Sequence, residues 1–173
     1  MIKIRSGVGY DIHRLVPGAG LMLGGVRVSA TLRAEAHSDG DVLIHSLIDA
    51  LLGAMGGPDI GELFPDSDPA FLGIAGTDLL RRVKTMLEAG NFEIMNLDCV
   101  VVTEAPKIAP FKSKIAENIA AILGIPRNDV NLKGKSKEKL DAVGRGEAIE
   151  CFSIAMIRFK NQSVSASDSD SKT

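Results

Sequence analysis

Residues 148–159 read Ala-Ile-Glu-Cys-Phe-Ser-Ile-Ala-Met-Ile-Arg-Phe, a stretch that predicts a long β-strand with apolar residues on both faces. A strand of this kind has to be covered on both sides. Helices of the same chain can cover one side, and another copy of the protein can cover the other. We therefore expect an oligomer rather than a three-layer monomer, because the chain has too few helices for three layers.

Upstream of this strand, the hydrophobic pattern predicts three helices and several shorter strands. The clearest helix spans 42–55, with Asp39 or Ser38 as its N-cap and a stop at 56–58. Two further helices are expected at 77–89, closed by Gly90, and from Pro110 to Gly124. The other expectations are a strand at 2–5, a loop at 6–20, a hairpin at 21–28 turning on 24–25, an irregular segment at 34–40, a loop at 59–71, and strands at 97–103 and 130–133.

The size and composition of the chain are those of an ordinary globular domain. Its 173 residues, 45% hydrophobic and 24% charged, predict one domain at 1–160 and a disordered polar tail at 161–173. The net charge of −2 gives no reason to expect nucleic acid or an anionic membrane as a partner. We expect no membrane span and no signal peptide, hence a bacterial cytoplasm, or a plastid stroma if a transit peptide was removed. Cys99 and Cys151 lie in apolar runs and are expected to be buried, reduced thiols.

The histidines point to a metal site near the start of the chain. Asp11 and His13 are two residues apart, so in an extended segment their side chains face the same way. His45, on the predicted helix 42–55, can add a third ligand. Two imidazoles and one carboxylate leave the fourth position of a tetrahedral zinc open, which is the catalytic pattern. Mn or Fe can use the same donors, and a histidine in a helix can equally be structural.

Two further segments have features of phosphate-binding loops. Residues 103–110 connect a strand to a helix start, where free backbone N–H groups favour anions, and they include Lys107. Residues 133–140 carry four lysines around Ser136 and Glu138, and Glu138 can hold a divalent ion that bridges phosphates. The alternatives are an ordinary connection and a solvated basic face. The acidic residues of 57–69 can contact hydroxyl groups or simply form turns.

Together these segments resemble the family of 2-C-methyl-D-erythritol 2,4-cyclodiphosphate synthases. The resemblance covers residues 2–159 and excludes the tail. The matching motifs, in family order, are GYDIH (9–13), GGV (24–26), AHSDGDVLIH (36–45), DALLGA (49–54), DIG (59–61), FPDSDP (64–69), APK (105–107), EKL (138–140) and GRGE (144–147).

The resemblance implies a fold, an assembly and site residues. The fold is α+β, a single domain with one mixed sheet covered by helices on one face, the other face packing in a homotrimer with active sites between subunits. Asp11, His13 and His45 match zinc ligands, and Glu138 matches the ligand of a second ion, Mg²⁺ or Mn²⁺. His37 and Ser136 match catalytic, transition-state-stabilising residues. Substrate contacts are expected from Asp11, Ile12, His13, His37, Ser38, Asp59, Ile60, Gly61, Phe64, Pro65, Asp66, Ser67, Asp68, Thr103, Glu104, Ala105, Pro106, Lys107, Ile108, Ala109, Lys135, Ser136, Lys137, Glu138, Ala142 and Arg145.

The implied reaction converts 4-diphosphocytidyl-2-C-methyl-D-erythritol 2-phosphate to 2-C-methyl-D-erythritol 2,4-cyclodiphosphate and CMP. It belongs to non-mevalonate isoprenoid biosynthesis and would make the chain a phosphorus–oxygen lyase. The chain departs from the family at Lys135 and Lys137, where small hydroxyl residues are common, and at Ala142, where an aromatic is common. Two other functions remain open on the residues alone: a zinc phosphohydrolase that activates water, and a nucleotide-binding or structural trimer with a zinc staple.

Overall fold

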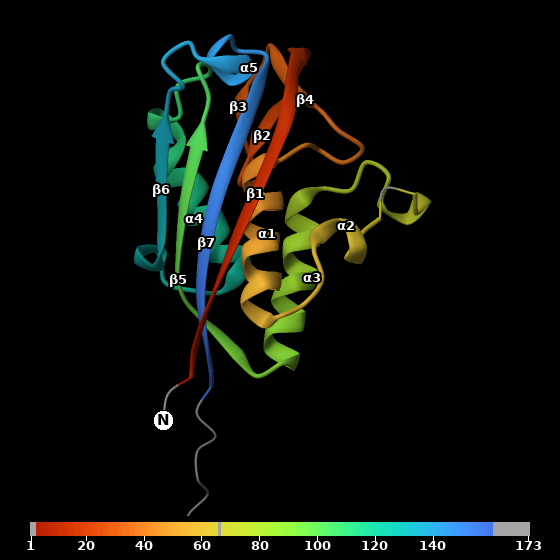
Figure 1. Cartoon of the computed structure of the whole chain (residues 1–173), viewed down its shortest axis with the longest axis vertical. Coiled ribbons are helices and arrows are strands. Elements are labelled where there is room, and N and C mark those ends of the chain that lie inside the picture. The colour runs from red at the N-terminus through yellow and green to blue at the C-terminus, as the bar shows by residue number, and fades with distance from the viewer. Residues whose placement is uncertain (1–2, 66, 161–173) are drawn as a thin grey trace, which may run out of the picture.

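A five-stranded mixed sheet with helices on one face forms the body of the protein in the computed structural model, which describes residues 3–65 and 67–160 (Figure 1). The strand order is β4 (Leu32–Glu35), β1 (Ile4–Pro17), β7 (Ala148–Phe159), β5 (Phe92–Val102) and β6 (Val130–Lys135). Within this sheet of the described residues, β5 and β6 pair in parallel and the other neighbours pair antiparallel. The predicted α+β class and the mixed sheet are therefore confirmed.

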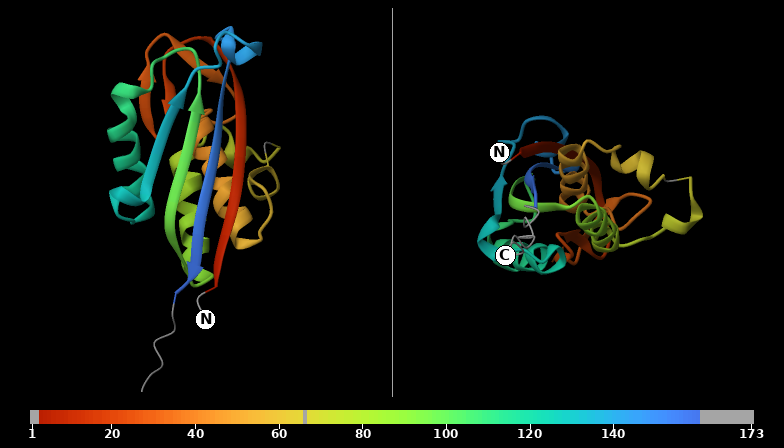
Figure 2. Two further views of the ribbon diagram at one scale, coloured as in Figure 1. Left: turned by 60° about the vertical axis from the view of Figure 1, so that its left-hand side comes forward. Right: turned by 90° about the horizontal axis from the view of Figure 1, so that it is seen from below.

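Three helices cover a single face of this sheet (Figure 2). Helix α1 (Val42–Met55) packs on β1 and β7, α3 (Gly76–Ala89) lies against α1, and α4 (Lys112–Leu123) packs on β6. Two short helices, α2 (Ile60–Leu63) and α5 (Asp141–Gly144), and the hairpin β2 (Leu21–Leu23)–β3 (Val26–Ser29) complete the domain. No helix in the described part of the chain is long and apolar enough to cross a membrane.

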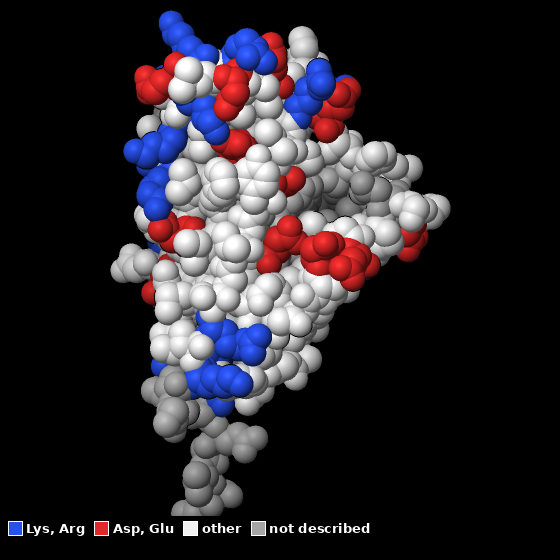
Figure 3. Space-filling model, viewed as in Figure 1, with Lys and Arg blue, Asp and Glu red and all other residues white. Residues whose placement is uncertain are grey.

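The central strand β7 has the two apolar faces that its sequence predicts. Toward the helices it buries Cys151 and Ala155, whereas Phe152 and Ile154 on the opposite side are exposed. Val8, Tyr10 and Ile12 of β1 continue this exposed apolar face, and the Tyr10 and Phe152 rings are 4.7 Å apart. Figure 3 shows the result as an uncharged surface across β5, β7 and β1, between charged residues at either end. We call it the open sheet face.

Strand β1 is much longer than expected, because residues 6–17 are strand and not loop. The glycines that indicated a loop instead allow α1 to pack closely on the strand. A Cβ on Gly9 would lie 1.8 Å from the carbonyl oxygen of Ser46, and one on Gly7 would lie 2.0 Å from that of Ala50. No larger residue fits at such a backbone-to-backbone approach.

Helix α1 is capped by Asp41, and the prediction of Asp39 or Ser38 was wrong. The Asp41 carboxylate accepts the Ile44 N–H at 3.1 Å and also the N–H groups of Gly24 at 2.9 Å and Gly25 at 2.7 Å. It therefore joins the helix to the β2–β3 hairpin. Asp39 instead accepts the N–H of Gly76, at the start of α3, at 2.9 Å.

The other elements follow the predictions with a few local differences. The hairpin turn at 24–25, α3 and the helix end at Gly124 are confirmed. Strand β5 begins at Phe92 rather than at 97, β6 ends at Lys135, and Pro110 lies in a 3-10 turn (Ala109–Phe111) just before α4. Strand β4 and helices α2 and α5 were not expected; β4 is defined by pairing with β1, which its own short sequence does not encode. The predicted tail at 161–173 lies outside the described residues.

Candidate active site

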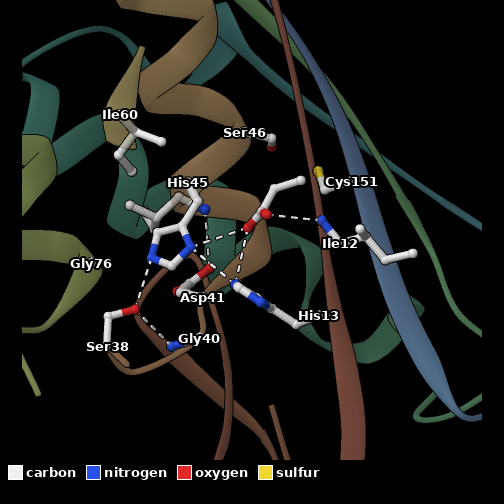
Figure 4. Close-up of polar contacts among 12 residues, drawn as sticks. Ile12, His13, Ser38, Gly40, Asp41, His45, Ser46, Ile60, Gly76 and Cys151 are labelled. Carbon is white, nitrogen blue, oxygen red and sulfur yellow. Dashed lines mark hydrogen bonds and ion pairs between the residues drawn. The ribbon is translucent and has the colours of Figure 1, made fainter. Parts of the chain in front are cut away.

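Asp11, His13 and His45 converge at the point where β1 and α1 approach each other most closely. Asp11 and His13 project from the same side of β1, as alternate strand residues do, and His45 projects from the first turn of α1. The Asp11 Oδ2 atom lies 3.1 Å from His13 Nε2 and 3.1 Å from His45 Nδ1, and these two nitrogens are 3.1 Å apart (Figure 4). The predicted three-residue cluster is thus present in the fold.

The donor geometry fits a tetrahedral metal ion. Ligands at the usual zinc distance of about 2.0–2.1 Å are separated by about 3.3–3.4 Å in a tetrahedron, close to the spacing within this cluster. Among the described residues, these three side chains are the group placed to hold an ion, so a fourth position stays open toward a ligand. His45 Nε2 lies 3.2 Å from the Ser38 Oγ, a contact that orients the ring with Nδ1 toward Asp11 and His13.

The electrostatics favour an ionised carboxylate at this position. Burial by itself raises the pKa of Asp11, but hydrogen bonds and charge from His13 and His45 outweigh it and hold the pKa well below its usual range. For His45, burial lowers the pKa, yet the hydrogen bond and charge of Asp11 produce a net increase. Protons and a cation therefore compete for this site.

The metal cluster borders a cavity of about 350 Å³, which we call the metal pocket. His37 and Ser38 line one wall, and Ile60, Gly61 and Phe64 line another. The Ile60 N–H donates to Asp49 of α1 at 2.8 Å, which fixes α2 beside the pocket. The sequence interpretation missed further lining residues, which carry no chemical motif and reach the pocket through folding: Glu35, Ala36, Phe71, Ile74 and Leu79.

The acidic residues of 59–68 mainly organise local structure. Asp59 caps α2 by accepting the Glu62 N–H at 2.8 Å, and Asp68 caps a 3-10 turn by accepting the Ala70 N–H at 2.9 Å. Pro65 and Ser67 belong to the connection between these two short elements. Asp66 lies outside the described residues, so its predicted contact with substrate hydroxyls stays a prediction.

A second cavity, of about 260 Å³, lies between the loop after β5 and the end of β6; we call it the lysine pocket. Thr103, Pro106, Lys107, Ile108 and Ala109 line one side, Lys135 and Ser136 line the other, and the predicted contacts of this loop with substrate stay a prediction. The Thr103 hydroxyl donates to the Ala105 carbonyl at 2.7 Å, and the Ala105–Pro106 peptide is cis. Lys112 and Gly134 also line it and were not predicted. The two pockets share no lining residue.

The remaining predicted residues make contacts within the protein. Glu138 accepts a hydrogen bond from Ser136, and Arg145 forms a two-pronged ion pair with Glu147 at 3.0 and 2.9 Å. Ala142 packs in a small apolar cluster with Val102, Val143 and Ala148. The Ile12 side chain lies on the open sheet face, while its N–H donates to Asp11 at 2.9 Å. The Glu104 carboxylate accepts the Lys137 N–H at 2.9 Å, and the Lys137 ammonium forms an ion pair with Glu150.

This fold and this site define an α+β protein with three side chains placed to hold a metal ion beside one pocket, and with a lysine-lined loop pocket elsewhere. The YgbB family model matches residues 4–158. A 2-C-methyl-D-erythritol 2,4-cyclodiphosphate synthase of Caldicellulosiruptor bescii is 46% identical over 157 residues, which are 91% of this chain and 99% of that protein. The chain belongs to this family of cyclodiphosphate synthases.

Solved structures show the same relationship. The IspF of Plasmodium falciparum in complex with CDP matches with a TM-score of 0.81 at 37% identity, covering 91% of this chain and 97% of that one. The bifunctional IspDF of Campylobacter jejuni matches with a TM-score of 0.90 at 37% identity over 93% of this chain. This chain spans only 44% of that bifunctional protein.

Proposed function

We propose that this protein converts 4-diphosphocytidyl-2-C-methyl-D-erythritol 2-phosphate to the 2,4-cyclodiphosphate and CMP, as a phosphorus–oxygen lyase. The observation that carries the proposal is the open three-donor centre of Asp11, His13 and His45, held at the mouth of a pocket in a chain of this family. The proposed step is internal: an oxygen of the 2-phosphate attacks the β-phosphorus, the bond from that phosphorus to the bridging oxygen breaks, and CMP leaves.

The nucleophile in this step is already an anion, so no general base is needed. The protein has to fold one flexible substrate back on itself and offset the charge repulsion between its phosphates. In our proposal His37 and Ser38 contact the phosphorylated end of the methylerythritol, and loop 103–109 holds the cytidine through backbone groups. Ser136 donates a hydrogen bond to charge that develops during transfer.

We infer that the ion held by Asp11, His13 and His45 is zinc, because two imidazoles and a carboxylate are typical zinc donors. Glu138 would hold a second divalent ion, Mg²⁺ or Mn²⁺, in the substrate complex. When bound, the ions supply charge neutralisation and template the diphosphate. Asp11 is well suited to this role, since its depressed pKa keeps it ionised.

We also propose that the working unit is a homotrimer with active sites between subunits. Two features support this. The open sheet face carries exposed Phe152, Ile154 and Val8, a contiguous apolar surface that a partner would cover. In addition, the metal pocket and the lysine pocket of one copy share no lining residue. In the proposed trimer, the metal pocket of one subunit and the lysine pocket of its neighbour together hold the two ends of the substrate.

The reaction itself is tested by incubating the protein with the CDP-linked substrate, with and without a chelator, and recording phosphorus NMR spectra. We expect a cyclic diphosphate and CMP, both absent after chelation. An uncyclised phosphate beside the nucleotide would instead identify a phosphohydrolase, and full turnover without metal would refute the proposal.

The shared site is tested by mixing two impaired variants. His45→Ala damages the metal pocket and Ser136→Ala damages the lysine pocket, so a mixed trimer contains some interfaces with both halves intact. We expect co-refolded or co-expressed mixtures to be more active than either variant alone. Mixing two portions of His45→Ala is the matched control. Failure of the mixed trimers to regain activity would place the whole site within one chain.

A further inference from the structure

Residues 136–141, which we call the lysine turn, have an unusually strained backbone. Glu138, Lys139 and Asp141 have φ values of 51°, 64° and 54°, in the left-handed region that side chains disfavour. Such conformations persist only where surrounding contacts impose them. The turn follows β6 and carries Ser136 and Glu138, both placed in the proposed chemistry, so whatever imposes its shape also positions these two groups.

Part of this constraint comes from the backbone of the turn. The Glu104 carboxylate, from the loop after β5, accepts the N–H of Lys137 at 2.9 Å and that of Lys139 at 3.3 Å. At the other end, Asp141 accepts the Val143 N–H at 2.9 Å. These bonds tie the turn to the loop after β5 and to α5, but none of the three joins it to a strand of the central sheet.

The Lys137 side chain makes the connection to the sheet. Its ammonium forms an ion pair with Glu150 of β7 and lies 3.7 Å from Asp141 Oδ2. Glu150 is 5% exposed, and the Tyr10 hydroxyl of β1 donates to its second oxygen at 3.1 Å. Hydrogen bonding to Glu150 raises the pKa of Lys137, so the amine stays charged. A buried carboxylate requires such a partner, which makes this contact costly to break.

These contacts make Lys137 a poor phosphate ligand. Two carboxylates surround its single positive charge, so the net charge at this point is negative rather than attractive to an anion. Lys135, by contrast, lines the lysine pocket. The resemblance to the family had indicated a substrate contact at both lysines, yet their side chains have different surroundings.

We propose that Lys137 is a positioning residue: its ion pair with Glu150 anchors the lysine turn to β7 and thereby holds Ser136 and Glu138 in place for the reaction. The expected effect on kcat rests on the proposed function, whereas the anchoring of the turn by the ion pair is independent of it. Glu150 lies opposite Val102 of β5 and Ile12 of β1 in the sheet register, so the anchor point is in the middle of the sheet rather than at its edge.

The kinetic test uses Lys137→Met, Glu150→Met and the double variant, with Lys84→Met as control. Lys84 forms an ion pair with Glu88 at 3.3 Å on α3, away from both pockets, so its loss should leave kcat unchanged. For Lys137→Met we expect kcat to fall roughly 10- to 100-fold because the catalytic turn shifts. KM should change by roughly threefold or less, because no substrate contact is lost.

The double variant separates anchoring from direct binding. If Lys137 acts through Glu150, the double variant loses no more activity than the worse single variant, because the same contact is removed twice. Losses that multiply, a rise in KM with unchanged kcat, or no change in Lys137→Met would each overturn the inference. Thermal unfolding of each variant identifies any that fails to fold, and Glu150→Met then serves as the second route to the same contact.

Amide hydrogen exchange tests the anchor without turnover. In Lys137→Met the amides of 137–140 should exchange roughly threefold faster or more, while the α3 amides in the same sample stay unchanged. Unchanged exchange in the turn would overturn the inference even if the wild-type protein makes the cyclic product. If instead the wild-type protein makes no such product while the turn is released as expected, the proposed function fails and the anchor stands.

Discussion

The metal pocket and the lysine pocket are built by opposite means. The metal pocket takes its charged donors from the middle of a strand and the first turn of a helix, and the backbones of these elements touch at Gly9. The lysine pocket takes its groups mainly from the loop after β5 and from the end of β6, and left-handed residues and ion pairs hold the turn that follows β6. Backbone packing positions the groups of the metal pocket, and side-chain contacts position those of the lysine pocket.

This difference has a physical reason in the tasks proposed for the two pockets. Ligands of a tetrahedral ion have to be held within a few tenths of an ångström, which secondary structure does well. A loop that contacts a flexible nucleotide has to admit and release it, and loops provide that freedom. The comparison predicts that substitutions in the metal pocket are more damaging than those in the lysine pocket.

The largest effect is expected from His45→Ala, which should remove the bound metal. Losing the ion removes several kcal/mol of charge stabilisation, so turnover should fall by about 10³-fold or more. Metal content by atomic emission and single-turnover kinetics measure the two quantities. A variant that keeps its full activity after losing its metal would contradict the assignment of this centre.

Gly9→Ala should break the backbone approach beneath the metal centre. The new Cβ would lie 1.8 Å from the Ser46 carbonyl oxygen, and backbone atoms cannot move aside as a flexible side chain can. We expect a loss of about 3 kcal/mol or more in the free energy of unfolding, together with weaker metal binding. Denaturant unfolding measures the loss in the free energy of unfolding.

The matched control for that prediction is Gly57→Ala, just after α1. Its Cβ would lie 3.5 Å from the Leu52 carbonyl oxygen, an ordinary contact, and should cost less than about 1 kcal/mol. Equal destabilisation by the two substitutions would show that the close backbone approach at Gly9 is not the cause of the stability loss.

In the lysine pocket, Ser136→Ala should have a smaller and purely kinetic effect. Removing one hydrogen-bond donor to developing charge lowers kcat by about 10²-fold. Metal content and the free energy of unfolding should match those of the wild-type protein, because Ser136 is outside the metal cluster and its hydroxyl donates to Glu138 in the same turn. A loss of bound metal in this variant would mean that the two pockets are not independent.

The smallest effect concerns the strands beneath the lysine pocket. Asp98 of β5 pairs with Lys133 at 2.7 Å and Asn131 at 2.8 Å on β6. Burial by itself raises the pKa of Asp98, but the hydrogen bonds from Lys133 and Asn131 and the charge of Lys133 together outweigh it and lower the pKa. The pair therefore stabilises the protein above the unfolded pKa of about 4, and this contribution disappears as the pH falls through the lower folded value.

Because the Asp98 pair is solvated, its contribution should stay below about 1 kcal/mol. The measurement is the difference in unfolding free energy between the wild-type protein and Asp98→Asn, followed from pH 7 downward. A difference that grew on acidification would contradict the expected sign of this linkage.

The chemistry of the site was more predictable from sequence than its construction. Asp11, His13 and His45 follow from residue type and spacing, and they converge in the structure. The length of β1 did not follow, because Gly7 and Gly9 were taken as loop formers although Val8, Tyr10 and Ile12 alternate with them as in a strand. The capping residue of α1 did not follow either, because it depends on tertiary contacts. The Asp41 carboxylate also binds the N–H groups of a hairpin 16 and 17 residues away in the sequence.

The partner of Lys137 illustrates the same limit. The lysine-rich segment 133–139 indicates a basic surface, but the neighbour that neutralises Lys137 is Glu150, on another strand. Sequence spacing alone cannot pair them, since the intervening turn reverses direction through left-handed residues. Local patterns therefore identified the groups that do chemistry, whereas the contacts that orient them required the fold.

The first and last strands of the sheet run side by side, with Ile4 opposite Arg158, while His13 lies opposite Ile149 at the other end of the pair. Val102, next to the lysine pocket, pairs with Glu150, which is also close to the His13–Ile149 end of the strands. Both pockets are therefore remote from the opposite end, where β1 starts and β7 finishes (Figure 1). Any polypeptide joined before β1 or after β7 would emerge there, clear of substrate entry. The domain is thus suited to genetic fusion, because a second catalytic module or an affinity tag at either terminus would be attached at the end of these strands that lies opposite both pockets.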